Sequence, residues 1–272
     1  MIFMIRPAVS CFWLLVLVGG LSACVERNEA PAPPPVPLRF RIKSIQNVTL
    51  GQTATYTYDS QGRPASFSLS DGGRGSYAYN GVPNRYAELT YMPGDTQQQA
   101  TLTRFPYPFM ASDTFSVSTY SLRDTRLLFA ITDYTLDASN HLQSTITRQS
   151  GSSINGQYSY LGENIESSSI VLMRTRVRLS YQYDTNPNPF AELMVVGPLL
   201  DPFDPGFQRG ITLSSIDEAL RFSRNNITQT QQADTGETTQ YKYAYNTNKL
   251  PITLARTANN ATTTYQFTYE TY

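Results

Sequence analysis

Side chains that commonly do chemistry are scarce in this sequence of 272 residues. His141 is the only histidine, and it follows a turn-forming run, so we expect it at the start of a surface strand. A Ser-His-Asp triad would need this histidine, and no Gly-x-Ser-x-Gly turn is present to carry the nucleophile. A tetrahedral zinc site needs four ligands, chiefly histidine and cysteine, which one histidine without a free cysteine cannot supply. The sequence therefore predicts no metal site and no catalytic residues.

Paired carboxylates are the remaining route to catalysis, because two facing acids can hydrolyse a glycosidic bond. Most of the aspartates lie in runs of turn residues: Asp59, Asp71, Asp95, Asp137 and Asp184. The acids outside such runs are Glu88, Glu163, Glu166 and Glu192. Spacing places no two of them across one cleft, so a polysaccharide hydrolase is the least favoured function. Asp201 and Asp204 could bind calcium in a tight loop, but a proline-bounded turn explains them as well and is preferred.

The N-terminus contains a second kind of chemistry, at a cysteine. Arg6 precedes an apolar run over 11–18, which is typical of a secretory signal. Leu21, Ser22, Ala23 and Cys24 follow, and they resemble the bacterial lipobox. The resemblance implies that a lipid is attached to the Cys24 thiol. It also implies that a peptidase recognises Leu21, Ser22 and Ala23 and cuts before Cys24.

A membrane-spanning helix and an ordinary secretory signal are the alternatives to this interpretation. A spanning helix needs about 20 apolar residues, and Gly19-Gly20 interrupts the apolar run early. Cys11 would leave with the signal peptide, so the mature chain has no second cysteine for a disulfide. We therefore expect a signal peptide over 1–23 and a lipid-anchored mature protein.

A proline-rich segment follows Cys24, with five prolines between Ala30 and Leu38. Proline favours an extended polyproline conformation, so residues 24–37 should form the lipidated cysteine and a tether. Val25 does not argue for inner-membrane retention, and Glu26 and Glu29 resemble the acidic patch that accompanies surface export in some Bacteroidota lipoproteins. We expect an outer-membrane location and favour the cell surface over the periplasmic face.

The composition of the remaining residues, 38–272, is typical of β-sheets. The chain has 19 tyrosines and 13 phenylalanines, with only 15% charged residues. Basic and acidic residues are equal in number, which gives no reason to expect nucleic acid as a partner. The expected partners are the membrane, through the lipid on Cys24, and a glycan or an envelope protein.

Aromatic and small polar residues alternate along many segments, for example in Thr55–Tyr58, Ser76–Tyr79, Ser180–Tyr183 and Thr264–Tyr269. Period two places each aromatic row on one face of a sheet. Turn signals separate these segments. We therefore expect an all-β domain of consecutive antiparallel hairpins forming a curved or superhelical open sheet. The tyrosine rows either pack within this sheet or stack on sugar rings, and packing is preferred.

A degenerate repeat runs through the β domain. The segments 56–64, 134–142 and 243–251 each place an aspartate or asparagine after a strand end, followed by a short polar turn. With the pairs Tyr58-Asp59 and Tyr183-Asp184, they resemble YD-repeat hairpins. From about residue 160 onward the chain resembles Bacteroidota lipoproteins of a domain-of-unknown-function family. The resemblance implies a β-rich envelope protein and adds no catalytic residues.

One segment departs from the β pattern. Ser215 and Glu218 fit a helix capping box, and apolar residues follow at helical spacing. We expect one short helix over about 215–224, covering one end of the sheet.

The sequence thus favours a non-enzymatic lipoprotein of the cell envelope that binds a polymer, such as a glycan, or a protein partner. It predicts no cofactor. The alternative is a structural scaffold whose edge strands pair with a neighbour.

Overall fold

The computed structural model describes residues 39–79, 86–95, 98–106, 113–149, 151–172, 174–191 and 215–272. Leu21, Ser22, Ala23, Cys24 and the tether lie outside these residues, as do Glu192, Asp201 and Asp204. The chain from Leu38 to Tyr272 forms one compact unit.

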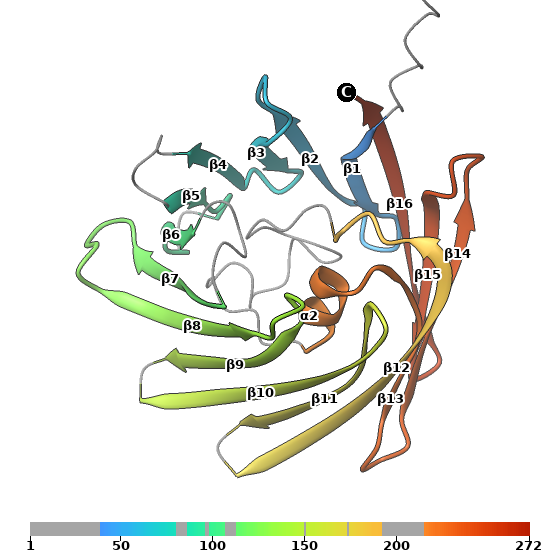
Figure 1. Cartoon of the computed structure of the whole chain (residues 1–272). Coiled ribbons are helices and arrows are strands. Elements are labelled where there is room, and N and C mark those ends of the chain that lie inside the picture. The colour runs from blue at the N-terminus through green and yellow to red at the C-terminus, as the bar shows by residue number, and fades with distance from the viewer. Residues whose placement is uncertain are drawn as a thin grey trace, which may run out of the picture. The chain divides into compact units, whose positions relative to one another are not determined.

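Within the described residues, sixteen antiparallel strands form a closed barrel in which each strand pairs with its neighbours in the sequence (Figure 1). The strands are β1 (Phe40–Asn47), β2 (Gln52–Tyr58), β3 (Pro64–Leu69), β4 (Arg74–Tyr79), β5 (Tyr86–Met92), β6 (Thr101–Pro106), β7 (Thr114–Ser121), β8 (Leu128–Leu136), β9 (Leu142–Gln149), β10 (Ser152–Leu161), β11 (Asn164–Leu172), β12 (Thr175–Pro187), β13 (Asn225–Gln232), β14 (Thr238–Tyr245), β15 (Pro251–Ala258) and β16 (Ala261–Thr271). A helix, α2 (Ser215–Phe222), precedes β13.

The expected open, curved or superhelical sheet is wrong, because the first and last strands pair. The β1–β16 ladder runs from Phe40 opposite Thr271 to Asn47 opposite Tyr265. An ion pair between Arg41 and Glu270 (2.6 Å) lies on this seam. Consecutive hairpins look the same in an open and a closed sheet, so local sequence patterns do not report this last pairing. Closure leaves no exposed edge strand, whose backbone groups would otherwise be unpaired.

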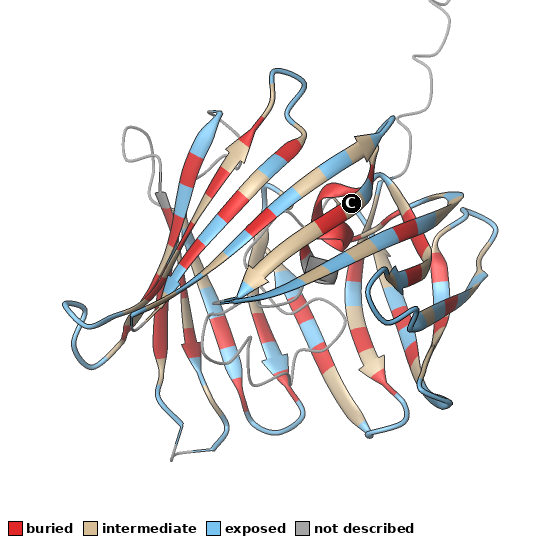
Figure 2. Ribbon diagram, turned by 90° about the horizontal axis from the view of Figure 1, so that it is seen from below, coloured by how far each residue is buried: buried red, intermediate tan, exposed pale blue. Residues whose placement is uncertain are grey.

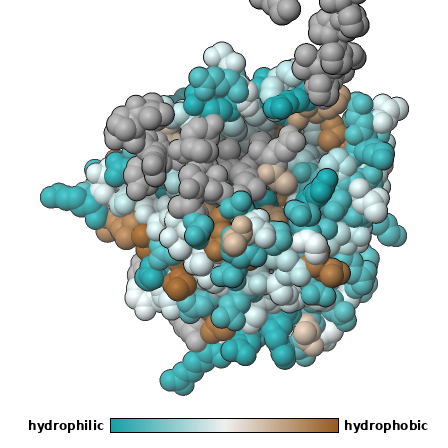
Figure 3. Space-filling model, viewed as in Figure 1, coloured by the Kyte–Doolittle hydropathy of each residue, from teal (hydrophilic) through white to brown (hydrophobic). Residues whose placement is uncertain are grey.

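The two faces of the wall differ in burial, because buried and exposed residues alternate along the strands (Figure 2). Inward positions are buried and largely aromatic or aliphatic, as in Tyr56, Phe67, Leu89 and Phe105. Outward positions carry mostly Thr, Ser, Gln and charged residues. Figure 3 looks onto the molecule as in Figure 1, and the described residues on that face are mostly hydrophilic, with apolar residues scattered among them. The predicted period-two alternation is thus present, and it separates the inside of the barrel from the outside.

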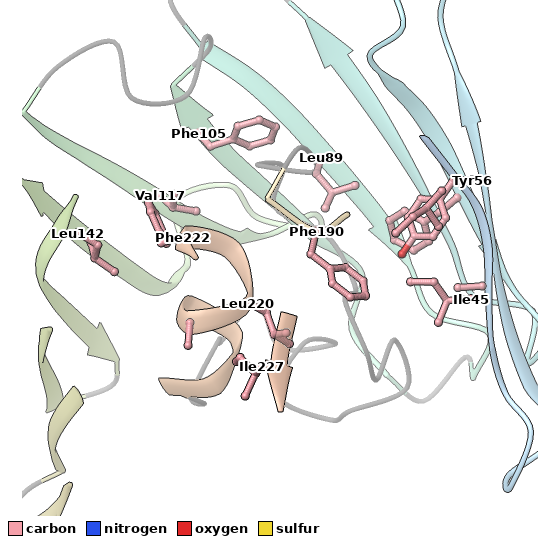
Figure 4. Packing of buried hydrophobic residues seen from close by; sticks show 14 of the residues in the cluster. Ile45, Tyr56, Leu89, Phe105, Val117, Leu142, Phe190, Leu220, Phe222 and Ile227 are labelled. Atoms are coloured by element: carbon pink, nitrogen blue, oxygen red, sulfur yellow. The ribbon is translucent and has the colours of Figure 1, made fainter. Parts of the chain in front are cut away.

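Helix α2 lies inside the ring of strands (Figure 1). From the sequence we expected this helix to cover one end of a sheet. It begins at Ser215 as expected and ends at Phe222. Ala219, Leu220 and Phe222 are buried in the same apolar core as the wall residues (Figure 4). No helix among the described residues has the length and apolar character needed to cross a membrane.

Polar side chains fix the C-terminal end of α2. The side-chain amide of Asn188 donates to the carbonyl oxygens of Leu220 (2.6 Å) and Ser223 (2.8 Å), which satisfies acceptors that a helix end leaves open. The hydroxyl of Ser223 accepts a hydrogen bond from the backbone of Ile165 on β11 (3.1 Å). Glu218 accepts one from the Tyr134 hydroxyl on β8 (3.1 Å). The helix is therefore attached to the wall at both β8 and β11.

Replacing a buried residue of α2 should test whether the helix is a structural part of the barrel. Leu220 is 1% exposed, and Leu220→Ala should lower the free energy of unfolding by about 2–5 kcal/mol, because it leaves a cavity. Leu161 is 72% exposed, and the matched Leu161→Ala should change it by about 0.5 kcal/mol or less. Urea unfolding followed by tyrosine fluorescence measures both. Equal, small effects would show that α2 is dispensable for the fold.

Candidate functional site

The turns that follow β2, β8 and β14 lie at the same end of the barrel, which we call the helix end. Asp59, Asp137 and Asn246 each accept backbone hydrogen bonds through Oδ1 from the residues two and four positions later, at 2.8–3.0 Å. The residue three positions later has a positive φ in each turn: Gly62 (80°), Asn140 (63°) and Lys249 (62°). The three segments aligned in the sequence therefore form the same turn.

A layer of inward-facing tyrosines lies next to these turns, which we call the tyrosine girdle. It consists of Tyr58, Tyr79, Tyr160, Tyr183 and Tyr269. Several of the hydroxyls donate to carbonyl oxygens of other strands, as Tyr79 does to Pro64 and Tyr269 to Pro251 (both 2.8 Å). Burial raises the pKa of Tyr183 and Tyr269 above the ordinary value. The tyrosine rows thus line the inside of the barrel and are not laid out on its outer surface.

Planar cationic and imidazole groups stack on the girdle. The Arg63 guanidinium lies 4.2 Å from the Tyr79 ring centre, and the His141 ring lies 4.3 Å from that of Tyr160. His141 precedes β9, as expected, and its backbone amide donates to Asp137. The only histidine of the sequence therefore belongs to a turn and an aromatic stack.

The described acids lie mainly in turns and ion pairs. Besides Asp59 and Asp137, Asp71 accepts from the Gly73 amide (2.8 Å) and Asp184 from the Asn186 amide (2.9 Å). Glu88 pairs with Arg104 on the outer wall (2.8 Å). Among the residues that the structure describes, no three His, Cys, Asp or Glu side chains gather where they could hold a metal ion.

A groove of about 790 Å³ opens at the helix end. Five separate parts of the chain line it, namely residues 39–42, 58–64, 187–189 and 248–250, and Tyr272. Its volume is in the range of sites for small organic ligands. The residues come from both ends of the β domain and from its middle, so spacing in the sequence could not have indicated this groove.

An arginine between two tyrosine rings forms one wall of the groove. The Arg41 guanidinium lies 4.1 Å from the Tyr58 ring centre and 4.7 Å from that of Tyr272, and it pairs with Glu270. The Tyr272 ring also lies against Gly62, where an added Cβ would come within 3.1 Å of it. The ring is therefore fixed in place although Tyr272 is 49% exposed.

Free hydrogen-bonding groups lie beside this aromatic surface. Arg39 and Asn248 are exposed lining residues, and within the described residues their side chains form no hydrogen bond or ion pair. The groove thus offers a flat aromatic face, a guanidinium and a carboxamide to a ligand. Such a combination suits polar ring compounds, and the described lining residues include no nucleophile paired with a base.

The hydrogen bonds in the helix-end turns should make the stability of the fold depend on pH. The His141 amide donates to Asp137 and holds the pKa of that carboxyl below its ordinary value. The carboxylate therefore stabilises the fold above about pH 4, the unfolded value, and this contribution is lost as the pH falls through the folded-state pKa. Asp137→Asn should keep the turn, as Asn246 does, and should reduce the loss of stability between about pH 5 and about pH 2.

The reverse change, Asn246→Asp, is the matched variant, and it should increase the acid sensitivity. Urea midpoints across this pH range measure both effects. Parallel pH profiles for the wild type and both variants would contradict the assignment of acid sensitivity to these turns.

Comparison with known proteins identifies a similar fold and no family. No family model matches the chain, and no curated protein matches it. The resemblance to YD-repeat hairpins therefore stays a prediction.

A solved structure of a porin-like protein from Bacteroides uniformis covers 84% of this chain and 96% of its own, with 13% identity and a TM-score of 0.53. A porin-like protein from Bacteroides vulgatus covers 84% and 98%, with 13% identity and a TM-score of 0.39. Both source organisms are Bacteroidota, the group indicated by the sequence. At this identity, the first of these structures shows a shared fold.

Proposed function

We propose that the chain is a non-enzymatic lipoprotein of the outer membrane. Its barrel stands in water, and the groove at the helix end binds a glycan. The observation that carries the proposal is the chemistry of the two faces of the wall.

The outward face is suited to water. Ion pairs cross neighbouring strands there, between Arg104 and Glu88 and between Arg148 and Asp133. A barrel that spans a membrane has the opposite arrangement, with an apolar outward band about 25 Å tall around the whole circumference. Larger outward apolar residues include Leu102 on β6, on the same face as Arg104, and Phe129, Ile131 and Ile146 on β8 and β9, beside the Arg148–Asp133 pair.

Membrane attachment in this proposal comes from the lipid on Cys24. The sequence motif Leu21–Cys24 supports it, and the porin-like description of the Bacteroides neighbour supports an outer-membrane location. The aromatic core and α2 occupy the interior, which favours a binding role over a wide water-filled channel.

The groove supports a glycan as the ligand. The fixed, half-exposed ring of Tyr272 offers an apolar face to a sugar, and Arg39 and Asn248 offer hydrogen bonds to hydroxyls. A scaffold that assembles through edge strands has no free edge in a closed barrel, so this alternative loses its physical basis.

The mode of attachment can be tested with the two cysteines. Cys24→Ser should move the protein from the membrane fraction to the fraction released by alkaline carbonate, because it removes the acceptor for the lipid. Cys11→Ser should leave the wild-type distribution unchanged. Retention of the Cys24→Ser protein in carbonate-washed membranes would contradict the proposal and indicate a spanning barrel.

Glycan binding can be tested with two tyrosines that each stack on an arginine. Tyr272→Ala should weaken binding up to about tenfold, because an aromatic contact contributes about 0.5–1.5 kcal/mol. Tyr120 stacks on Arg104 at the outer wall (5.3 Å), and Tyr120→Ala should leave binding unchanged.

Affinity electrophoresis of protein lacking residues 1–24, in gels containing envelope or plant polysaccharides, gives the apparent dissociation constants. The groove is excluded as the site if no polysaccharide retards the wild type, or if both variants lose binding equally.

A further inference from the structure

Five polar residues form a continuous row on the inner wall, away from the groove. They are Tyr241 on β14, Arg256 on β15, Tyr265 on β16, Asn47 on β1 and Gln52 on β2, and we call them the polar row. Tyr241 lies opposite Arg256, Tyr265 opposite Asn47, and Asn47 opposite Gln52. Leu254 lies opposite Tyr265, and Arg256 lies two residues after Leu254 on the same face of β15. Arg256 and Tyr265 are therefore diagonal neighbours, and the row is continuous across β15 and β16.

Arg256 is unusual among the arginines of this barrel. Six others pair with carboxylates, namely Arg41, Arg63, Arg104, Arg126, Arg148 and Arg178. Within the described part of the chain no carboxylate pairs with Arg256, which instead lies against the hydroxyls of Tyr241 and Tyr265. Burial lowers its pKa, but these hydroxyls outweigh that effect and the pKa stays above the ordinary value. The barrel therefore holds an inward-facing positive charge.

Two amide atoms farther along the row, on β1 and β2, have no hydrogen-bond partner among the described residues. Asn47 is 2% exposed, and its Nδ2 has no hydrogen-bond partner within the described residues, although its Oδ1 accepts from the Leu50 amide (3.1 Å). The buried Oε1 of Gln52 likewise has none there. A buried polar atom left unpaired costs about 1–3 kcal/mol, and such atoms in native proteins commonly mark a bound water, ion or ligand.

We propose that the polar row binds the carboxylate and a hydroxyl of an acidic sugar, a hexuronate. A guanidinium suits a carboxylate because two parallel N–H groups can donate to its two oxygens. Asn47 Nδ2 supplies a donor and Gln52 Oε1 an acceptor, which together match a hydroxyl group. Arg256 keeps part of its surface exposed, as do Ala258 and Thr263 next to it, so solvent reaches the row from the end opposite α2.

This site is separate from the groove, and binding there does not depend on the glycan proposal. The test uses folded protein lacking residues 1–24, with glucuronate and galacturonate as probes and glucose as the neutral control. Calorimetric titration and thermal unfolding should show saturable binding of at least one uronate and none of glucose.

The variants separate a specific site from a general effect of anions. Arg256→Gln should weaken uronate binding about tenfold or more, since a hydrogen bond to a charged group contributes about 1.5–3 kcal/mol. Two control variants should leave uronate binding unchanged. Arg148→Gln removes a charge from the outer wall, and Tyr272→Ala removes a ring from the groove. Arg256→Lys keeps the charge and should weaken binding several-fold, because lysine cannot donate two parallel hydrogen bonds.

The proposal is overturned if neither uronate binds the wild type, or if glucose binds equally well. It is also overturned if the Arg256 and Arg148 variants respond alike. If Arg256→Gln does not fold, Arg256→Lys and Asn47→Leu replace it. The proposal is then overturned if both of these variants bind uronate as tightly as the wild type.

Discussion

The antiparallel pairing of β1 with β16 is the constraint on which the rest of this structure depends. It joins residues about 225 positions apart, as in the Arg41–Glu270 hydrogen bond (|i−j| = 229). This pairing divides the chain into an inside and an outside and creates two ends. It also brings Arg41 and Tyr272 together at the groove, and Asn47 and Tyr265 together in the polar row. Both candidate binding sites therefore exist only because the barrel closes.

A sixteen-stranded barrel encloses more space than wall side chains of ordinary size can fill. Large inward aromatics and α2 solve this problem together, since Leu220 and Phe222 share one core with Tyr56 and Phe115. Tyrosine suits the positions near the rim, because its ring fills the interior while its hydroxyl reaches backbone carbonyls of other strands. The abundance of tyrosine is thus a consequence of filling a wide barrel.

The two candidate sites use polar chemistry in different ways. At the groove, Arg41 is already neutralised by Glu270, so the fixed Tyr272 ring and the exposed Arg39 and Asn248 remain for a ligand. In the polar row the positive charge of Arg256 has no carboxylate partner among the described residues, which favours an anionic group. The two proposed ligands, a glycan at the groove and an acidic sugar at the polar row, therefore differ because their environments differ.

The strands, the turns and the short helix of this protein follow from local patterns in its sequence. Period-two alternation gave the strands and their buried rows, and the Asp or Asn turns gave the connections at Asp59, Asp137 and Asn246. The capping residues and apolar spacing gave the helix at Ser215–Phe222. Each of these depends on interactions within about ten residues, which a local pattern can encode. The tertiary structure decided that the sheet closes, that α2 lies inside it, and which polar residues meet. Pairing across more than 200 residues depends on the accumulated twist and stagger of sixteen strands, and no short pattern records that sum.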